Sequence, residues 1–120
     1  MLIKGIVVAG FGEGKQIGYP TANLNLAKKS DKAEVGVYVG WVKINNLIKP
    51  GILIVGVYED KKDLSRHEVY IIDWSEAVYG NDIEFEPVKK IRDIIKMANR
   101  QALIKQIELD IIQAKEILGV

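Results

Sequence analysis

The chain has 120 residues, of which 48% are hydrophobic and 28% charged, and its formal net charge is +1. This balance is ordinary for a globular protein, and it argues against a nucleic-acid surface or a membrane patch. Cysteine is absent and His67 is the single histidine, which excludes disulfides, thiolate catalysis and Cys- or His-cluster metal sites. No membrane-length apolar run and no signal-peptide pattern occurs, so we expect one cytoplasmic domain over residues 1–120.

Short strands separated by turns are predicted over most of the chain. β-Branched and aromatic residues favour strands at 2–8, 35–44, 52–58, 67–74 and 83–86. Turns are expected at Asn45-Asn46, Pro50-Gly51 and 79–82, and polar connections at 25–34 and 59–66. Pro87 is expected to confine the last strand to an edge or an end. His67 is expected at the surface without a role, and Trp41 and Trp74 in packing.

The end of the chain has helical periodicity instead. Asn99 is a typical helix-capping residue and Gly119 a typical terminator. Between them, apolar residues at helical spacing form one face: Leu103, Ile107, Ile111, Ala114 and Leu118, widened by Ile104, Ile112 and Ile117. The whole pattern predicts a mainly β fold, a small antiparallel, Greek-key-like six-stranded β-barrel with one long C-terminal α-helix packed against it.

Glycines gather near the start of the chain, where five of the eleven lie within residues 5–18. A loop of this kind can present free backbone N–H groups to an anion, and Lys15 adds a positive charge. The spacing fits neither the Walker phosphate loop nor the dinucleotide-binding fingerprint. A glycine-rich hairpin between two strands is the alternative that the glycines alone leave open.

The segment that follows the glycines carries two neutral oxygen ligands. Pro20 has a fixed φ and biases Tyr19 toward extended geometry, so Thr21 and Asn23 follow on a stiff segment. With period-two alternation, the Thr21 hydroxyl and the Asn23 amide point the same way. Such groups suit a Mg²⁺ ion whose other ligands are water and substrate phosphates.

These residues resemble the opening signature of the riboflavin kinases, Gly5-x-Val7-x-x-Gly10 and then Gly14-Lys15-x-Ile17-Gly18-Tyr19-Pro20-Thr21-Ala22-Asn23-Leu24. The likeness continues through Gly36 to Gly40, Glu68 to Trp74, Tyr79-Gly80, Ile91-Arg92 and the terminal helix. It implies Mg²⁺ on Thr21 and Asn23, Glu68 as the catalytic base, and Arg92 near the flavin. The nucleotide-binding residues that it implies are Gly10, Gly12, Gly14, Lys15, Gly18, Pro20, Thr21, Asn23 and Tyr79.

The chain departs from the family pattern on the flavin side of the implied site. Ile54 stands where the family has Asn, Tyr70 where it has His, Ile94 where it has Glu, and Met97 where it has Phe. The family's Pro-Thr-Phe segment is lost within residues 59–63. The implied phosphate and metal sites are unaffected.

The resemblance implies transfer of the γ-phosphoryl of ATP to the ribityl 5′-hydroxyl of riboflavin, giving FMN, with Mg²⁺ as cofactor. We expect small-molecule substrates, a monomer, and no nucleic-acid or membrane partner. Many bacterial members carry an adenylyltransferase domain ahead of the kinase. None is expected here, so a separate FAD synthetase is a candidate partner. The departures motivate an alternative, a catalytically weak or inactive flavin- or nucleotide-binding barrel. A barrel for single-stranded nucleic acid is disfavoured by the charge.

Overall fold

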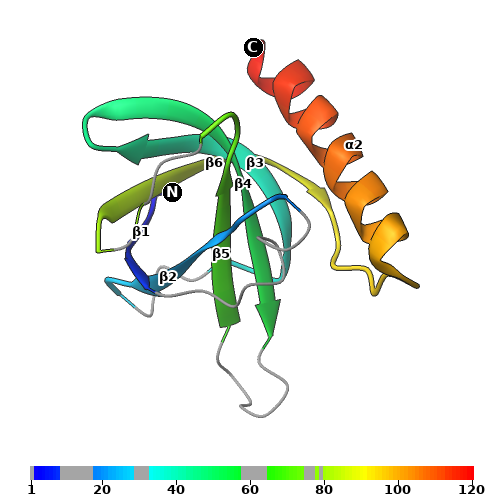
Figure 1. The fold of residues 1–120 in the computed structure, drawn as a ribbon. Coiled ribbons are helices and arrows are strands. Elements are labelled where there is room, and N and C mark those ends of the chain that lie inside the picture. The colour runs from blue at the N-terminus through cyan, green and yellow to red at the C-terminus, as the bar shows by residue number, and fades with distance from the viewer. Residues whose placement is uncertain (1, 9–17, 29–32, 58–64, 75–77, 79) are drawn as a thin grey trace.

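Six strands and one helix are formed by the part of the chain that the computed structural model describes, residues 2–8, 18–28, 33–57, 65–74, 78 and 80–120. They are β1 (Ile3–Val8), β2 (Ala22–Leu26), β3 (Gly36–Ile44), β4 (Leu47–Val57), β5 (Ser65–Ile71), β6 (Asp82–Arg92) and α2 (Arg100–Leu118). Neighbouring strands are antiparallel and close into a barrel in the order β1-β2-β5-β4-β3-β6 (Figure 1). The predicted barrel with one C-terminal helix is confirmed.

The barrel interior is apolar because alternate residues of each strand point inward. In β1, for example, buried and exposed residues alternate without a break. Phe85 on β6 is fully buried at the centre, where Gly40 and Gly51 face each other across β3 and β4. A Cβ at either glycine would approach the Phe85 ring, and at Gly40 it would also collide with a β6 carbonyl. These two glycines therefore make room for the largest core side chain.

A second apolar cluster lies outside the barrel, beneath α2. Ala114 on the helix is fully buried against Val37 and Val39 of β3 and Ile52 of β4. Figure 1 shows α2 lying along one side of the barrel as a covering element. This helix is not long and apolar enough to cross a membrane, and no other helix occurs in the described ranges.

The ends of α2 are as predicted. The side chain of Asn99 accepts a hydrogen bond of 2.8 Å from the Ala102 N–H, and Gly119 ends the helix in the left-handed conformation at φ 72°. The predicted apolar face is also confirmed, since Leu103, Ile107, Ile111, Ala114 and Leu118 are all at least half-buried. Ile112 is wrong as a member of this face, because its side chain points to solvent and is 55% exposed.

Two proline positions correct the predicted strand limits. Pro50 and Gly51 form no turn but lie within β4, where Pro50 is just beyond the last residue that pairs with β5. Its carbonyl accepts the Ile72 N–H at 3.0 Å, so no ladder bond depends on the missing proline N–H. Pro87 does not end β6 either. It lies where the register with β3 shifts, and such a bulge accommodates proline inside a strand.

Other corrections concern residues predicted in loops or at the surface. Asn25 and Leu26 belong to β2, and Arg66 belongs to β5, which ends at Ile71. His67 is only 2% exposed and lies inside the barrel wall, where its Nε2 accepts the Ala33 N–H at 3.1 Å. The alternation of β5 turns His67 inward because its neighbours Arg66 and Glu68 face the other side.

Candidate functional site

The predicted metal and base residues lie side by side on the outer face of the barrel. Asn23 of β2 is directly opposite Glu68 of β5, and Ile54 of β4 is opposite Glu68 on its other side. Ala22 and Leu24 face the core, so the residues that alternate with them face outward. The structure thus brings Thr21, Asn23 and Glu68 together from segments more than forty residues apart in sequence.

One oxygen of the Glu68 carboxylate has two donors. The Thr21 hydroxyl donates to Oε1 at 3.2 Å, and Nη2 of Arg66 donates to the same oxygen at 3.0 Å. The side chains of Arg66 and Glu68 are 29% and 19% exposed, so the ion pair is partly shielded from water. Both donors fix the orientation of the carboxylate. A reacting group can then approach through the second oxygen, Oε2.

Asn23 has a buried acceptor that this part of the protein leaves unused. The residue is 8% exposed, and its Oδ1 has no hydrogen-bond partner among the described residues. Burying a carbonyl oxygen without a partner costs free energy, so such an atom needs an explanation. A divalent cation is one. Together with the Thr21 hydroxyl, this oxygen is a donor set that fits Mg²⁺.

A cavity of about 240 Å³ opens beside Glu68, between the barrel wall and α2. Its lining residues are Tyr19, Thr21, Ile52, Ile54, Arg66, Glu68, Tyr70, Arg92, Ile94, Ile95, Met97, Leu103, Ile107 and Asp110. Thr21, Arg66 and Glu68 make one end polar, whereas isoleucine, leucine and methionine side chains dominate the rest. The cavity therefore joins a polar part to an apolar part, as small-molecule sites commonly do.

Arg92 lines this cavity but is engaged by the helix. Its Nε and Nη2 donate to the two oxygens of Asp110 at 2.9 and 2.8 Å, and the Gln106 amide donates to the same carboxylate at 2.9 Å. Asp110 is buried, with 5% of its side chain exposed. This bidentate pair joins the end of β6 to the middle of α2 and thereby fixes one wall of the cavity.

Two tyrosines make another part of the wall. The rings of Tyr19 and Tyr70 meet edge to face, with centroids 5.9 Å apart and planes at 71°. Burial, followed by the charge of Asp73, raises the pKa of the Tyr70 phenol above its ordinary value. Tyr70 is therefore a neutral hydroxyl at physiological pH. Ile54, Tyr70, Ile94 and Met97, the departures from the family pattern, all line this one cavity.

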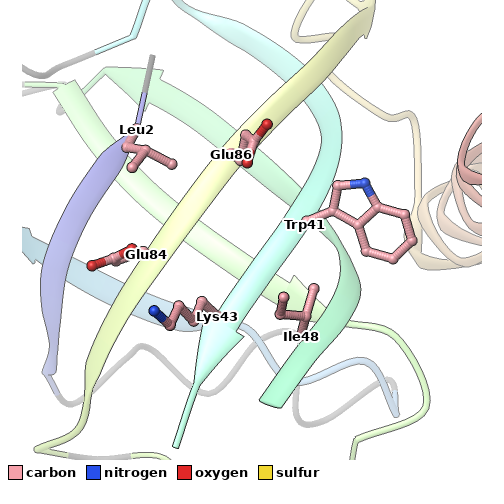
Figure 2. Close-up of a pocket in the computed structure, with 6 residues that line it drawn as sticks. All are labelled: Leu2, Trp41, Lys43, Ile48, Glu84 and Glu86. Atoms are coloured by element: carbon pink, nitrogen blue, oxygen red, sulfur yellow. The ribbon is translucent and has the colours of Figure 1, made fainter. Parts of the chain in front are cut away.

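A second cavity, of about 410 Å³, lies on another part of the outer barrel wall. Figure 2 shows its six residues: Trp41, Lys43, Ile48, Glu84 and Glu86 lie on neighbouring strands, and Leu2 lies just before β1. Trp41 pairs with Glu86 and Lys43 with Glu84 across β3 and β6. None of the predicted site residues within the described ranges lines it. Although it is larger, we place the functional site in the cavity beside Glu68.

Several predicted residues are not described by the structure. Gly10, Gly12, Gly14, Lys15 and Tyr79 lie outside the described residues, so the predicted phosphate loop stays a prediction. Gly18 is exposed at φ 89°, a conformation that favours glycine, and Pro20 is exposed just before Thr21.

Arg66 and Asp110 were missed by sequence reasoning. Arg66 stood at the end of a charged run that reads as a connection. A usable signal was its spacing of two from Glu68, which puts both residues on one face of a strand. Asp110 was signalled by its place between Ile107 and Ile111 on the packed helix face, where a carboxylate needs a partner.

Comparisons with known proteins agree with this architecture. A family model described as "Flavokinase: Riboflavin kinase" matches residues 1–118. The bifunctional riboflavin kinase/FMN adenylyltransferase of Bacillus subtilis is 35% identical over 112 residues, which cover 90% of this chain and 35% of that protein. The chain therefore spans about a third of the length of this relative.

Two solved structures share the fold. One is described as a macrolide-efflux protein from Streptococcus pneumoniae, with a TM-score of 0.85 and 32% identity over 95% of this chain and 38% of that one. The other is a riboflavin kinase from Trypanosoma brucei, with a TM-score of 0.77 over 98% of this chain and 79% of that one. The latter is 22% identical and supports the fold alone.

Proposed function

This chain belongs to the riboflavin kinase family, and we propose that it transfers the γ-phosphoryl of ATP to the ribityl 5′-hydroxyl of riboflavin. The observation that carries the proposal is the position of Glu68. Its carboxylate is held by Thr21 through a 3.2 Å hydrogen bond, directly across from the buried acceptor of Asn23. The proposed base and one proposed metal ligand, Thr21, thus line the polar end of one cavity, and the second proposed ligand, Asn23, is paired with Glu68 across β2 and β5.

The reaction would use these residues as follows. The ribityl chain lies at the polar end of the cavity, and its terminal hydroxyl donates to Oε2 of Glu68. As the hydroxyl oxygen bonds to the γ-phosphorus, its proton passes to Glu68, and the bond from phosphorus to the β-phosphate oxygen breaks, with its electron pair leaving on ADP. Mg²⁺ held by Thr21 and Asn23 would offset the charge of the nucleotide phosphates.

The apolar part of the cavity would bind the isoalloxazine ring. Ile52, Ile54 and Ile107 lie on facing elements, β4 and α2, and give an apolar slot for a flat ring. Arg92 remains a proposed flavin contact. Its side chain would act from the rim, since its Nε and Nη2 are engaged by Asp110. The proposed reaction needs no cofactor besides Mg²⁺.

The test is conversion of riboflavin to FMN, followed by chromatography with Mg²⁺ and each nucleoside triphosphate in turn. Glu68→Gln keeps the size of the side chain but cannot take up the proton, so turnover should fall by on the order of 10²–10⁴. Glu86→Gln is the matched control, because that exposed carboxylate lies on β6 at the other cavity.

Binding and chemistry can be separated by flavin fluorescence titration alongside single-turnover FMN formation. Glu68→Gln should bind riboflavin as the parent does. Parental turnover by Glu68→Gln would remove Glu68 from the mechanism. A parent protein that binds flavin yet makes no FMN with any nucleotide would favour the alternative, a flavin-binding barrel without turnover.

A further inference from the structure

The polar end of the cavity contains a cation, Arg66, that the proposed reaction has not yet used. Arg66 lies two residues before Glu68 on β5, on the same outer face, and lines the same cavity. Its Nη2 is 3.0 Å from Oε1 of Glu68. We propose that Arg66 is a catalytic residue that binds the phosphoryl group during transfer. The inference rests on the proposed kinase function.

Distance places the guanidinium close to the reacting atoms. In a productive complex the hydroxyl oxygen donates to one Glu68 oxygen and lies about 3–3.5 Å from the phosphorus. Arg66 already contacts the other oxygen of the same carboxylate. The phosphoryl group and the guanidinium are therefore both neighbours of one carboxylate, within the reach of a flexible arginine side chain.

The charges of the groups explain what a contact between Arg66 and the phosphoryl group would do. The transferred phosphoryl carries negative charge on three oxygens and must approach the Glu68 carboxylate, which is also negative. A guanidinium between them reduces this repulsion and stabilises the charge that develops in the transition state. With five N–H donors in a planar fork, it can bind a carboxylate through one nitrogen and a phosphoryl oxygen through another.

Arg92, the other arginine of the cavity, shows what a structural arginine looks like here. Its Nε and Nη2 bind both oxygens of Asp110, whose side chain is 5% exposed, and the pair joins two elements of the fold. Arg66 instead donates to one oxygen of the proposed base, and its side chain lines the cavity and is 29% exposed, so its charge lies where a ligand would bind.

The test is a double-mutant cycle measured as single-turnover FMN formation with saturating riboflavin and Mg-ATP. Arg66→Ala should lower the rate by on the order of 10³-fold, the low end for arginines that stabilise phosphoryl transfer. Riboflavin affinity should stay within a few-fold of the parent value. Added guanidinium ion should restore part of the lost rate. Lys43→Ala, which removes an exposed cation at the other cavity, should leave the rate unchanged.

The cycle with Glu68→Gln separates catalysis from positioning. If Arg66 binds the phosphoryl group, Arg66→Ala should still slow the Glu68→Gln protein clearly, although by a smaller factor than it slows the parent, because the two residues are in contact and the repulsion from Glu68 is already removed. An effect that vanishes in the Glu68→Gln background would overturn the proposal, because Arg66 would then act only by orienting Glu68. If Arg66→Ala does not fold, Arg66→Lys takes its place in the cycle, since lysine keeps the charge but loses the planar fork.

Failure of this inference differs from failure of the proposed function. A parent protein that makes FMN, together with an Arg66→Ala variant of parental rate, would overturn the role of Arg66 alone. A parent protein that makes no FMN with any nucleotide would overturn both.

Discussion

Two buried polar atoms, one on each side of the barrel wall, differ in their contacts. On the inner side, His67 is 2% exposed, and its Nε2 accepts the Ala33 N–H, so the polar atom ties a connecting segment to the barrel. On the outer side, Asn23 is 8% exposed, and its Oδ1 finds no partner among the described residues. The hydrogen bond to His67 Nε2 serves the fold, whereas the Asn23 acceptor costs stability, and this cost motivates our proposal of a ligand there.

Ionic groups on the outer side show the same contrast at close range. Arg92 and Asp110 satisfy each other and fasten α2 to β6. Arg66 and Glu68 also pair, but there Arg66 and Thr21 both donate to the same carboxylate oxygen, Oε1. The outer wall thus has a structural part under the middle of α2 and, in our proposal, a catalytic part at β2 and β5. Mutations can test this division, because a change on the inner side should lower the free energy of unfolding more than a change in either part of the outer wall.

The largest effect is expected from the inner wall. Phe85→Ala removes a fully buried ring that fills the space above Gly40 and Gly51, and the glycines offer no side chains to close the cavity. The free energy of unfolding should fall by about 3–5 kcal/mol. Urea unfolding measures the loss, with Val88→Ala as the control because Val88 is 50% exposed on the same strand.

If Phe85→Ala and Val88→Ala melted alike, the interior would not be the main source of stability, and the contrast between the two sides of the wall would fail. Loss of activity in Phe85→Ala should follow loss of folded protein. At low temperature, the folded fraction should bind riboflavin as the parent does.

Much of this inner wall was predictable from sequence. β-Branched alternation located the strands around Val37, Leu53 and Ile83, because a strand with one buried face must repeat every two residues. The helix was equally predictable, since Asn99 and Gly119 mark its ends through local backbone geometry.

Features that depend on pairing were not predictable in this way. Pro50 and Pro87 look like strand breakers. Only the pairing of their neighbours shows that Pro50 lies just beyond the ladder with β5 and that Pro87 lies where the register with β3 shifts. His67 and Arg66 follow a charged segment, and local composition does not say which side of the wall each residue faces. Thr21, Asn23 and Glu68 were identified by a family resemblance, and their direct pairing across β2 and β5 became visible only in the fold.

A middle-sized effect of unusual sign is expected on the outer wall. Asn23→Leu replaces a buried amide, whose oxygen lacks a partner among the described residues, by an apolar side chain of similar size. Because the desolvation cost of that oxygen disappears, the free energy of unfolding should stay unchanged or rise by up to about 1 kcal/mol. Metal-dependent nucleotide binding should be lost, as measured by calorimetric titration with Mg-ATP.

Asn25→Leu is the matched control, because Asn25 is exposed and lies two residues further along the same strand. It should bind Mg-ATP as the parent does. A clearly destabilised Asn23→Leu would mean that the Asn23 amide serves the fold, as His67 does. Mg-ATP binding that survives Asn23→Leu would remove Asn23 from the metal site.

The smallest effect is expected at Tyr70, which belongs to the apolar part of the outer wall. Burial and Asp73 raise the pKa of this phenol above 10.0, so the folded protein holds the proton more tightly than the unfolded chain does. The resulting stability is fully present below the ordinary pKa and is lost as the pH rises through the raised value. Tyr70→Phe should therefore unfold like the parent at pH 7, and its free energy of unfolding should decline less steeply with pH above 10.

Urea unfolding at a series of pH values measures this stability, and absorbance at 295 nm follows the ionisation of the phenol. Tyr19→Phe, which alters the partner ring of the same edge-to-face pair, is the control. If Tyr70→Phe lost stability at pH 7, the hydroxyl would have a structural partner, and this part of the wall would resemble the inner side after all.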